Sequence, residues 1–302
     1  MQLQTPPLLS RGDTIALLSP ASAIDPALLD GAAAAIAAAE GFVPLIMPGA
    51  KGSCGSFSAP AADRLADLQA AVDNPAVKAI ICGRGGYGAV HLLDRLHLTR
   101  PVWLAGFSDI SALHALWHIN GFRSIHSSMA KELTRSLCPG NEANLRLFEI
   151  LRTGHMPPIQ FDAHPLNRPG TARGTLRGGN LAVLDGLVGT PFDLLTLPDT
   201  ILVIEDIAEP IYKVERMLWR LKLAGVFDRL SGLVVGRFTD YRPSADWADM
   251  YSMIASVVAG YSFPVAFNAP IGHIDANLPF LEGTPAILTI TDSLSTIKSY
   301  NP

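Results

Sequence analysis

A serine at a strand-to-helix turn is the first chemical candidate in this chain. The stretch "VWLAGFSDISALHALW" predicts an apolar strand, the turn Gly106-Phe107-Ser108-Asp109 and then a helix. A nucleophile elbow places a serine on such a turn, and a small residue two positions earlier relieves crowding. The full G-x-S-x-G pattern is not met, because Ile110 stands at the second glycine position. Ser-Asp at a helix start is also typical of a plain N-cap, so both interpretations are open at this point.

A nucleophilic serine needs a base, and the base needs an acid that orients it. His273 lies in "FNAPIGHIDANLPFLEG", between an apolar run and turn residues, which is the loop setting typical of functional groups. His114 and His118 are four residues apart on the predicted helix, but no H-E-x-x-H glutamate precedes them, so we interpret them as packing or surface residues. Glu205 ends the apolar run "TILVIE", where a carboxylate can be partly buried, or can simply face solvent. Asp206 is its competitor.

The stretch "IICGRGGYGAV" carries a second candidate. Gly83, Gly85 and Gly88 spell the dinucleotide-binding fingerprint G-x-G-x-x-G, and Asp109 follows about 20 residues later, where a ribose-binding acid is expected. That fingerprint normally opens the first βαβ unit, whereas two strand–helix units precede it here. The same glycines also suit a tight structural turn. In a third interpretation, their N–H groups join the N–H of Asp109 in stabilising an oxyanion.

Apolar strands alternate with helical runs over the first half of the chain. The predicted strands are "TIALLSP", "FVPLIMP", "VKAIICG" and "PVWLAGFSD", and the helices that follow them are "PALLDGAAAAIAAAEG", "SAPAADRLADLQAAVDNP", "YGAVHLLDRLHL" and "ISALHALWHING". This alternation predicts a parallel sheet covered on both faces. The glycine turn and Ser108 should then lie at the same edge of that sheet, where its strands end.

The alternation of strand-like and helical runs stops at the stretch "GHMPPIQFDAHPLNRPGTARG", which is rich in Pro and Gly and lacks helical periodicity. Shorter strand-like runs and a few helices follow: "TARGTLRGG", "TILVIEDI", "YKVERMLWRLKLAG", "LSGLVVGRFT", "DWADMYSMIASVVAGY" and "PAILTITD". The expected fold class is α/β, with an N-terminal flavodoxin-like parallel-sheet domain plus a smaller β-rich C-terminal domain with helices. The predicted boundaries are 1–155 for the first domain, 156–172 for a linker and 173–302 for the second domain.

Composition narrows the class of protein. The formal net charge of −4 shows no basic excess, which argues against a nucleic-acid partner. The Ala-rich run is too short to span a bilayer, and the N-terminus does not read as a signal peptide, so we expect neither a membrane partner nor export. Cys54, Cys82 and Cys138 form no C-x-x-C pair, which disfavours a zinc site or a disulfide framework and favours a cytoplasmic location. Cys82, in an apolar run, is expected to be buried and inert.

Taken together and in order, the motifs resemble those of the serine LD-carboxypeptidases, a family that includes the murein tetrapeptide LD-carboxypeptidases of cell-wall recycling and the microcin-immunity carboxypeptidases. The matching stretches are "DTIALLSPAS", "GRGGYGA", "GFSDISALH", "LRGGNLAVLDGLVGTP", "ILVIEDIAEPIYKVERML" and "GHIDANLPFLEGTPAIL". The resemblance covers nearly the whole chain. It implies a hydrolase that needs no metal or other cofactor and uses a Ser-Glu-His triad: Ser108 as nucleophile, Glu205 as acid and His273 as base. The serine then comes from the first domain and its partners from the second.

The resemblance also implies an oxyanion hole formed by the backbone N–H groups of Gly86 and Asp109, with Gly85 as the alternative to Gly86. The implied substrate is a small peptide, typically a murein tetrapeptide that loses its terminal D-alanine from an L-centre. Arg84 beside the turn is expected to bind the terminal carboxylate, and Asn180 to line the site. A homodimer is also implied.

One stretch departs from the family pattern. Many relatives carry a Gly-Pro pair after the elbow helix, where this chain reads "IHSSMAKEL" with Ser127 and Ser128, so the shape of the pocket and the exact substrate are left open. Within the enzyme hypothesis, a peptide–nucleotide antibiotic of the microcin type is the alternative substrate. Two hypotheses from other classes are a dinucleotide-dependent oxidoreductase that uses Gly83 to Gly88 and a non-catalytic peptide-binding module.

Overall fold

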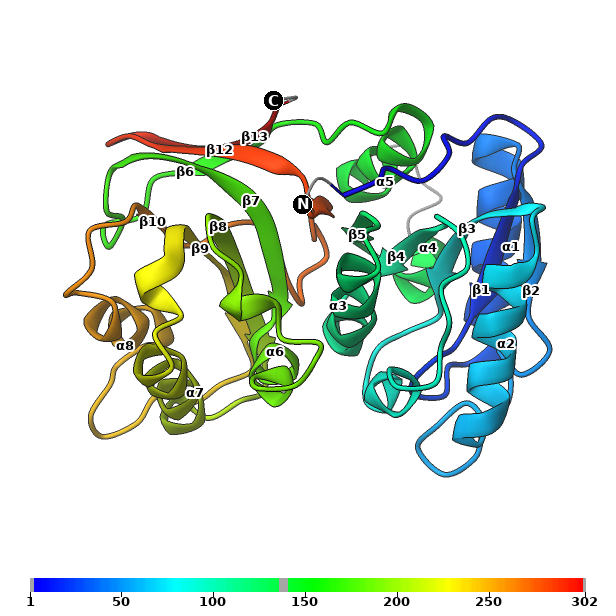
Figure 1. The fold of residues 1–302 in the computed structure, drawn as a ribbon, viewed down its shortest axis with the longest axis horizontal. Coiled ribbons are helices and arrows are strands. Elements are labelled where there is room, and N and C mark those ends of the chain that lie inside the picture. The colour runs from blue at the N-terminus through cyan, green and yellow to red at the C-terminus, as the bar shows by residue number, and fades with distance from the viewer. Residues whose placement is uncertain (1–2, 136–140, 301–302) are drawn as a thin grey trace. The chain divides into compact units, whose positions relative to one another are not determined.

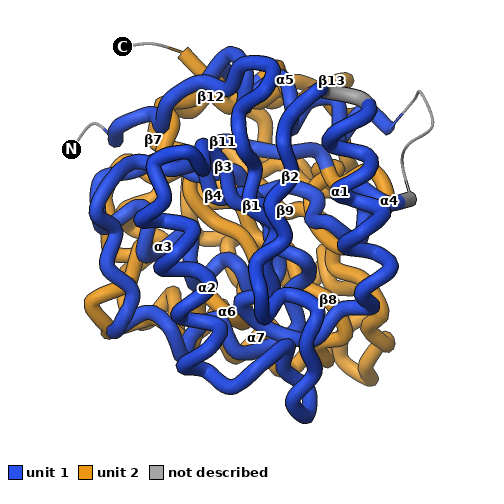
Figure 2. The backbone as a smooth tube through the Cα atoms, turned by 90° about the vertical axis from the view of Figure 1, so that its right-hand side faces the viewer, with its two compact units in different colours: residues 1–156, 278–282 blue, residues 157–277, 283–302 orange. Residues whose placement is uncertain are grey.

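The computed structural model describes residues 3–135 and 141–300 of the chain (Figure 1). They form two compact units, which Figure 2 colours separately. Unit 1 comprises residues 1–156 and 278–282, and unit 2 comprises residues 157–277 and 283–302. Cys138 lies outside the described residues. Within the described ranges, no helix has the length and apolar character needed to cross a bilayer.

Unit 1 is built on a six-stranded sheet with the order β11-β5-β4-β3-β1-β2. Its strands are β1 (Thr14–Leu18), β2 (Val43–Ile46), β3 (Val77–Cys82), β4 (Trp103–Gly106), β5 (Ser124–His126) and β11 (Phe280–Glu282). The first five run parallel, and β11 pairs antiparallel with β5 at the edge. The parallel order 2-1-3-4-5 is the flavodoxin-like order, so the predicted fold class is confirmed. Every residue of β4 is buried, as expected for a central parallel strand.

The helical segments of unit 1 follow the strands. They are α1 (Pro26–Glu40), α2 (Ala61–Asp73), η1 (Ala89–Leu92), η2 (Ser108–Ile110), α3 (Ser111–Ile119), α4 (Ala130–Arg135) and α5 (Glu142–Thr153). Local signals explain where helix α1 begins and ends. The Asp25 side chain caps its start, Pro26 lies in the first turn, and Gly41 ends the helix in the left-handed conformation. Helix α1 packs against α4, whereas α2 and α3 both contact η1.

The helix predicted over "YGAVHLLDRLHL" is wrong in extent. The structure has only the short 3-10 segment η1, followed by turns. The side-chain amide of Gln69 on α2 accepts a hydrogen bond from the His97 N–H at 3.0 Å and donates one to the His97 carbonyl at 2.9 Å. Both backbone groups of His97 therefore bond to a side chain of α2 and not to other groups of a helix. This tertiary contact overrides the helical periodicity of the sequence.

Unit 2 is built on a seven-stranded mixed sheet with the order β10-β9-β8-β7-β12-β13-β6. Its strands are β6 (Ile159–Asp162), β7 (Gly170–Asn180), β8 (Thr200–Ile207), β9 (Leu230–Thr239), β10 (Val265–Ala266), β12 (Pro285–Ile290) and β13 (Leu294–Ser299). Strands β7 to β10 are parallel, and β12, β13 and β6 continue the sheet in antiparallel pairs. The unit is therefore rich in strands, as predicted.

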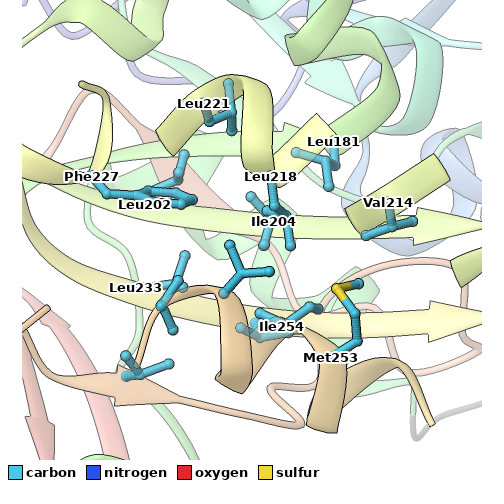
Figure 3. Packing of buried hydrophobic residues seen from close by; sticks show 14 of the residues in the cluster. Leu181, Leu202, Ile204, Val214, Leu218, Leu221, Phe227, Leu233, Met253 and Ile254 are labelled. Atoms are coloured by element: carbon cyan, nitrogen blue, oxygen red, sulfur yellow. The ribbon is translucent and has the colours of Figure 1, made fainter. Parts of the chain in front are cut away.

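The core of unit 2 lies between this sheet and its helices. These are α6 (Leu181–Leu187), η3 (Leu194–Thr196), α7 (Ile211–Leu223), η4 (Phe227–Arg229) and α8 (Met250–Val257). Leu202 and Ile204 of β8 pack in one cluster with Leu218 of α7 and Ile254 of α8 (Figure 3). Because side chains alternate along a strand, β8 presents every second residue to the helices and the residues between them to the other face of the sheet.

The two compact units differ from the predicted domains at two places. Residues 157–172, within the stretch interpreted as a linker, belong to unit 2, because β6 pairs there with β13. Residues 278–282 belong to unit 1, because β11 pairs with β5. Both strands are short, at four and three residues, and a strand of that length carries little periodic signal.

Candidate active site

Ser108 lies on the turn between β4 and α3 with a φ of +64°. The left-handed region costs an L-residue roughly 1–2 kcal/mol, and such strain at a strand-to-helix turn is the backbone signature of a nucleophile elbow. The plain N-cap interpretation is wrong. The N-cap of η2 is Phe107 and that of α3 is Ile110, and neither segment has a side-chain capping bond.

The residues around the elbow explain its partial match to G-x-S-x-G. A side chain at Gly106 would place its Cβ only 3.0 Å from Cγ1 of Ile110. Ile110 is fully buried, so the isoleucine fills the space above a glycine that must remain small. The first glycine of the motif is therefore needed for packing, and the second position is taken by a core residue.

The glycine turn after β3 lies directly against this elbow, since β3 and β4 are parallel neighbours. A Cβ on Gly85 would lie 2.8 Å from the Cβ of Ser108 and 2.9 Å from its Oγ. Ser22, in the loop after β1, bonds to the turn on its other side. Its N–H donates to the Gly85 carbonyl at 3.2 Å, and its Oγ accepts from the Tyr87 N–H at 3.2 Å. The turn is held closely beside the serine hydroxyl, as expected from the shared edge.

Backbone donors are available at this place. Among the described residues, neither the Gly86 N–H nor the Asp109 N–H donates a hydrogen bond, and the same holds for Gly85. Gly86 has a φ of +95°, and Ser22 lies where its Cβ would be, so no larger residue fits there. Unused N–H groups beside a strained serine are what an oxyanion hole requires. The choice between Gly85 and Gly86 stays open.

The dinucleotide hypothesis does not fit this geometry. Asp109, the candidate ribose acid, is buried, and its Oδ2 accepts a hydrogen bond from the Ala89 N–H at 2.8 Å. The segment that follows the glycines is a four-residue 3-10 turn, whereas pyrophosphate binding relies on the N-terminus of an α-helix. The side chain of Asp109 is therefore engaged in a hydrogen bond to the segment that follows the glycines.

The second half of the candidate site lies within unit 2. The Nδ1 of His273 lies 2.7 Å from the Oε2 of Glu205. A carboxylate can only accept, so Nδ1 carries the proton, and in the neutral ring Nε2 is left with a lone pair. The side chain of Glu205 is fully buried and that of His273 is 15% exposed. A buried acid that orients a partly accessible imidazole is the arrangement of a general base and its partner.

Two glycines make room for the buried acid. A Cβ on Gly272 would lie 3.0 Å from both the Cβ and the Oε2 of Glu205, and one on Gly236 would lie 3.3 Å from that Cβ. The Gly272 N–H donates to the Oδ1 of buried Asn277 at 2.9 Å, which braces the loop that carries His273. The Oε1 of Glu205 has no hydrogen-bond partner among the described residues. Burying a carboxylate with so few partners is costly, and such groups concentrate at functional sites.

Asp206, the competitor of Glu205, has a different role. Its Oδ1 accepts from Asn180 Nδ2 and from the Ile207 N–H, and its Oδ2 accepts from the Ala182 N–H, each at 2.9 Å. Asn180 itself caps α6 through the Val183 N–H at 3.2 Å. Burial, followed by the nearby Glu205 charge, raises the pKa of Asp206 to about 6, against the effect of these bonds. Asp206 therefore braces the start of α6, on the helix side of the sheet, while Glu205 contacts His273.

The two helical histidines are packing residues, as interpreted from the sequence. The Nε2 of His114 lies 2.9 Å from the Gly106 carbonyl and its Nδ1 lies 2.9 Å from the Ser124 Oγ. Full burial lowers the pKa of His114 to about 4, so the ring is neutral at pH 7. His118 is also buried. Within the described part of the chain, no cluster of three or more His, Cys, Asp or Glu side chains could hold a metal ion.

The remaining candidates lie around the elbow in unit 1. Arg84 is exposed on the glycine turn, where its guanidinium makes a long 3.4 Å bond to the Ala23 carbonyl. Ser127 and Ser128 are buried, and the Ser127 N–H donates to the Gly106 carbonyl at 3.0 Å, so this segment packs on the elbow itself. Cys82 is buried as predicted, and burial raises the pKa of its thiol, which makes it unreactive.

Two supporting residues were not found from the sequence. Arg64, on the polar-looking helix α2, is buried and donates to the Gly88 and Pro20 carbonyls at 2.8 and 2.5 Å. Asn277 lies in the quoted motif "GHIDAN" but looked like an ordinary turn residue. An arginine at a helical core position and an amide four residues after a candidate base were the available signals.

Comparison with known proteins follows the same two units. Residues 15–127 match the family model of the LD-carboxypeptidase N-terminal domain, and residues 173–288 match that of the C-terminal domain. The murein tetrapeptide carboxypeptidase of Pseudomonas aeruginosa is 33% identical over 74% of this chain and 76% of its own length. The microcin C7 self-immunity protein MccF of Escherichia coli is 24% identical over 70% of this chain and 71% of its own. A crystal structure of muramoyltetrapeptide carboxypeptidase from Oxalobacter formigenes, 27% identical, superposes with a TM-score of 0.81 over 96% of this chain and 100% of its own.

Proposed function

Since this chain belongs to the LD-carboxypeptidase family and is a serine-type carboxypeptidase, we propose that it hydrolyses an L,D peptide bond and releases the terminal D-alanine of a murein tetrapeptide in cell-wall recycling. The observation that carries the proposal is the φ of +64° at Ser108, which gives the serine the backbone of a nucleophile elbow. A cytoplasmic location and a homodimer, expected from the sequence, belong to the same proposal.

In the proposed reaction, Ser108 Oγ attacks the carbonyl carbon of the bond before the terminal D-residue. His273 Nε2 takes the hydroxyl proton, while Glu205 accepts the hydrogen bond from Nδ1–H and stabilises the imidazolium. Collapse of the tetrahedral intermediate breaks the C–N bond, and His273 returns the proton to the leaving amine of D-alanine. Water then attacks the Ser108 ester, His273 again takes a proton, and the shortened peptide leaves with Ser108 restored.

The oxyanion of each tetrahedral intermediate is proposed to be held by the N–H groups of Gly86 and Asp109, with Gly85 as the alternative donor. Their lack of other partners within the described chain supports this role. Arg84 is proposed to bind the terminal carboxylate that defines a carboxypeptidase substrate, and its exposed position on the glycine turn is compatible with this. Asn180 is proposed to line the site, held by its bonds to Asp206 and Val183.

The microcin-type alternative rests on the similarity to a self-immunity protein, which is weaker in identity than the similarity to the murein enzyme. Turnover on two substrates separates the two functions. The first is a tetrapeptide that ends in meso-diaminopimelyl-D-alanine or L-lysyl-D-alanine, and the second is a peptide–nucleotide conjugate of the microcin type.

We expect D-alanine release from the tetrapeptide, unchanged by a chelator, and little release from the matched tetrapeptide that ends in L-alanine. Faster turnover of the conjugate would favour the antibiotic function. Equal turnover of the D- and L-ending peptides would contradict the proposed L,D specificity.

A further inference from the structure

The side chain of Asp109 bonds across from the elbow to the glycine turn. Its Oδ2 accepts the Ala89 N–H at 2.8 Å, and Ala89 is the first residue of η1, directly after Gly88. Gly88, at the N-cap position of η1, has no side chain that could satisfy this N–H. The carboxylate from the neighbouring segment takes the place of the missing cap. Asp109 is 5% exposed, so the bond is shielded from water.

Arg64 also holds the end of the glycine turn, through the Gly88 carbonyl. It is 2% exposed, and its guanidinium donates to the Gly88 carbonyl at 2.8 Å. Gly88 has a φ of +121°, and the Phe57 ring and Arg64 Nη1 lie within 3.0 Å of where its Cβ would be. Burial raises the pKa of Asp109, and the Ala89 hydrogen bond and the Arg64 charge partly oppose this effect. The end of the turn is therefore held by two charged side chains of opposite sign.

A turn with glycines at 83, 85, 86 and 88 has no conformational preference of its own that would hold it in one shape. Its first residue, Gly83, bonds to the backbone of Leu18 and Lys131. Beyond Gly83, the turn is held by Ser22 on one side and by Asp109 with Arg64 on the other. The Asp109 carboxylate belongs to the same residue as one proposed oxyanion donor, and it bonds three residues beyond the other. It thus links the two segments that carry these donors.

We propose that the Asp109 carboxylate is a positioning residue, which locks the glycine turn against the elbow and so fixes the Gly86 N–H relative to the Asp109 N–H. This inference rests on the proposed function, because the two N–H groups are the proposed oxyanion donors. It concerns the side chain of Asp109, which is separate from the role of its backbone. Arg64 assists by holding the Gly88 carbonyl.

The test compares Asp109→Ala with Asp109→Asn, and both variants keep the backbone N–H at position 109. The alanine variant loses the acceptor for Ala89, whereas the asparagine Oδ1 can still accept that bond. For Asp109→Ala we expect kcat to fall about 10- to 100-fold, because a displaced oxyanion donor acts mainly on the transition state, with KM changed less than about twofold. Asp109→Asn should recover most of the loss. Equal losses in both variants, or full activity in Asp109→Ala, would overturn the proposal.

Amide hydrogen exchange gives a second readout that does not depend on activity. In Asp109→Ala, the peptides that cover residues 85–89 should exchange about 10- to 100-fold faster than in the wild type, and in Asp109→Asn close to the wild-type rate. Unchanged exchange in Asp109→Ala would refute the locking role whatever the activity. If the wild type shows no Ser108-dependent turnover, the proposed function fails, and the exchange rates still decide whether Asp109 locks the turn.

Asp67 supplies a matched control in the same unit. Its Oδ2 accepts the Gly49 N–H at 2.8 Å, so it also braces a turn through a carboxylate. Asp67→Ala should lower the melting temperature while kcat and the exchange of residues 85–89 stay at wild-type values. A loss of kcat in Asp67→Ala as large as that in Asp109→Ala would show a general effect of stability and would contradict a specific positioning role.

Discussion

Ser108 in unit 1 and the Glu205–His273 pair in unit 2 are held in place by different means. Ser108 is positioned by the backbone, through its φ of +64° and the close packing of Gly85. Glu205 is positioned by its surroundings, through the 2.7 Å bond to His273 and the glycines that leave room for it. The elbow should therefore tolerate a change of side chain at the serine itself. The acid should be sensitive to a single methyl group added beside it.

The largest effect is expected at Ser108. Ser108→Ala should lower kcat/KM for D-alanine release by at least about 10⁴-fold, because Ser108 is the proposed nucleophile that forms the ester. Ser108→Gly should be equally inactive yet more stable by about 1 kcal/mol, because glycine adopts a φ of +64° without strain. Kinetics and thermal unfolding of both variants check this. A Ser108→Gly variant less stable than the wild type would argue against a strained elbow.

Glu205→Gln should have the next largest effect on rate. The glutamine amide can donate to Nδ1 of His273 and so favour the tautomer whose Nε2 carries the proton and cannot act as a base. A loss of about 10³- to 10⁴-fold in kcat is expected. The melting temperature should stay the same or rise, since a buried charge is removed. A variant that keeps more than a tenth of wild-type kcat would contradict the assigned role of Glu205.

Gly272→Ala tests whether packing positions the acid. The added Cβ would lie 3.0 Å from the Glu205 carboxylate, at a φ of +125° that L-residues rarely adopt. We expect a loss of about 1–3 kcal/mol in stability and about a tenfold loss in kcat, since small displacements of catalytic groups are costly. Gly260→Ala in the same unit is the control, because no heavy atom lies within 4 Å of its added Cβ. Equal losses of stability and kcat in Gly272→Ala and Gly260→Ala would contradict the view that close packing positions Glu205.

The last prediction concerns the pH dependence of stability, through His114, which bonds to Gly106 of the elbow. The unfolded chain binds the His114 proton near the ordinary pKa of 6.5, whereas the folded protein binds it only near pH 4. Its contribution to stability is therefore complete above pH 6.5 and is lost as pH falls toward 4, by about 3 kcal/mol in total. His114→Gln should flatten the fall of unfolding free energy over this range. An unaltered slope in His114→Gln would contradict the buried neutral ring.

Strands β1 to β4 of unit 1 could be predicted because each was read as an apolar run followed by a helical run, and this pattern is local. Strand β9 was predicted over its full length for the same reason. The short strand β5 was not predicted. Strand β11 could not be, because its three residues pair with β5, which lies about 150 residues earlier in the chain. A segment whose conformation depends on so distant a partner has no signal in its own periodicity.

The candidate chemical residues could be predicted from motif order, but not the groups that hold them. Arg64 interrupts an apolar face and so reads as polar, although Arg64, Leu68, Ala71 and Val72 together form the buried face of α2. The separation of Glu205 from Asp206 likewise depends on which face of β8 each side chain takes. That choice depends on tertiary packing, because the helices of unit 2 pack on the face of β8 that carries Leu202 and Ile204.

The central proposal is that Ser108, Glu205 and His273 act as one catalytic group. The most direct test is kcat/KM for D-alanine release by Ser108→Ala, His273→Ala and the double variant, against the wild type. Residues that act as a unit give strongly non-additive losses. The account predicts that the double variant is no more than about threefold worse than the poorer single variant. Losses that multiply in the double variant, or wild-type activity in Ser108→Ala, would contradict it.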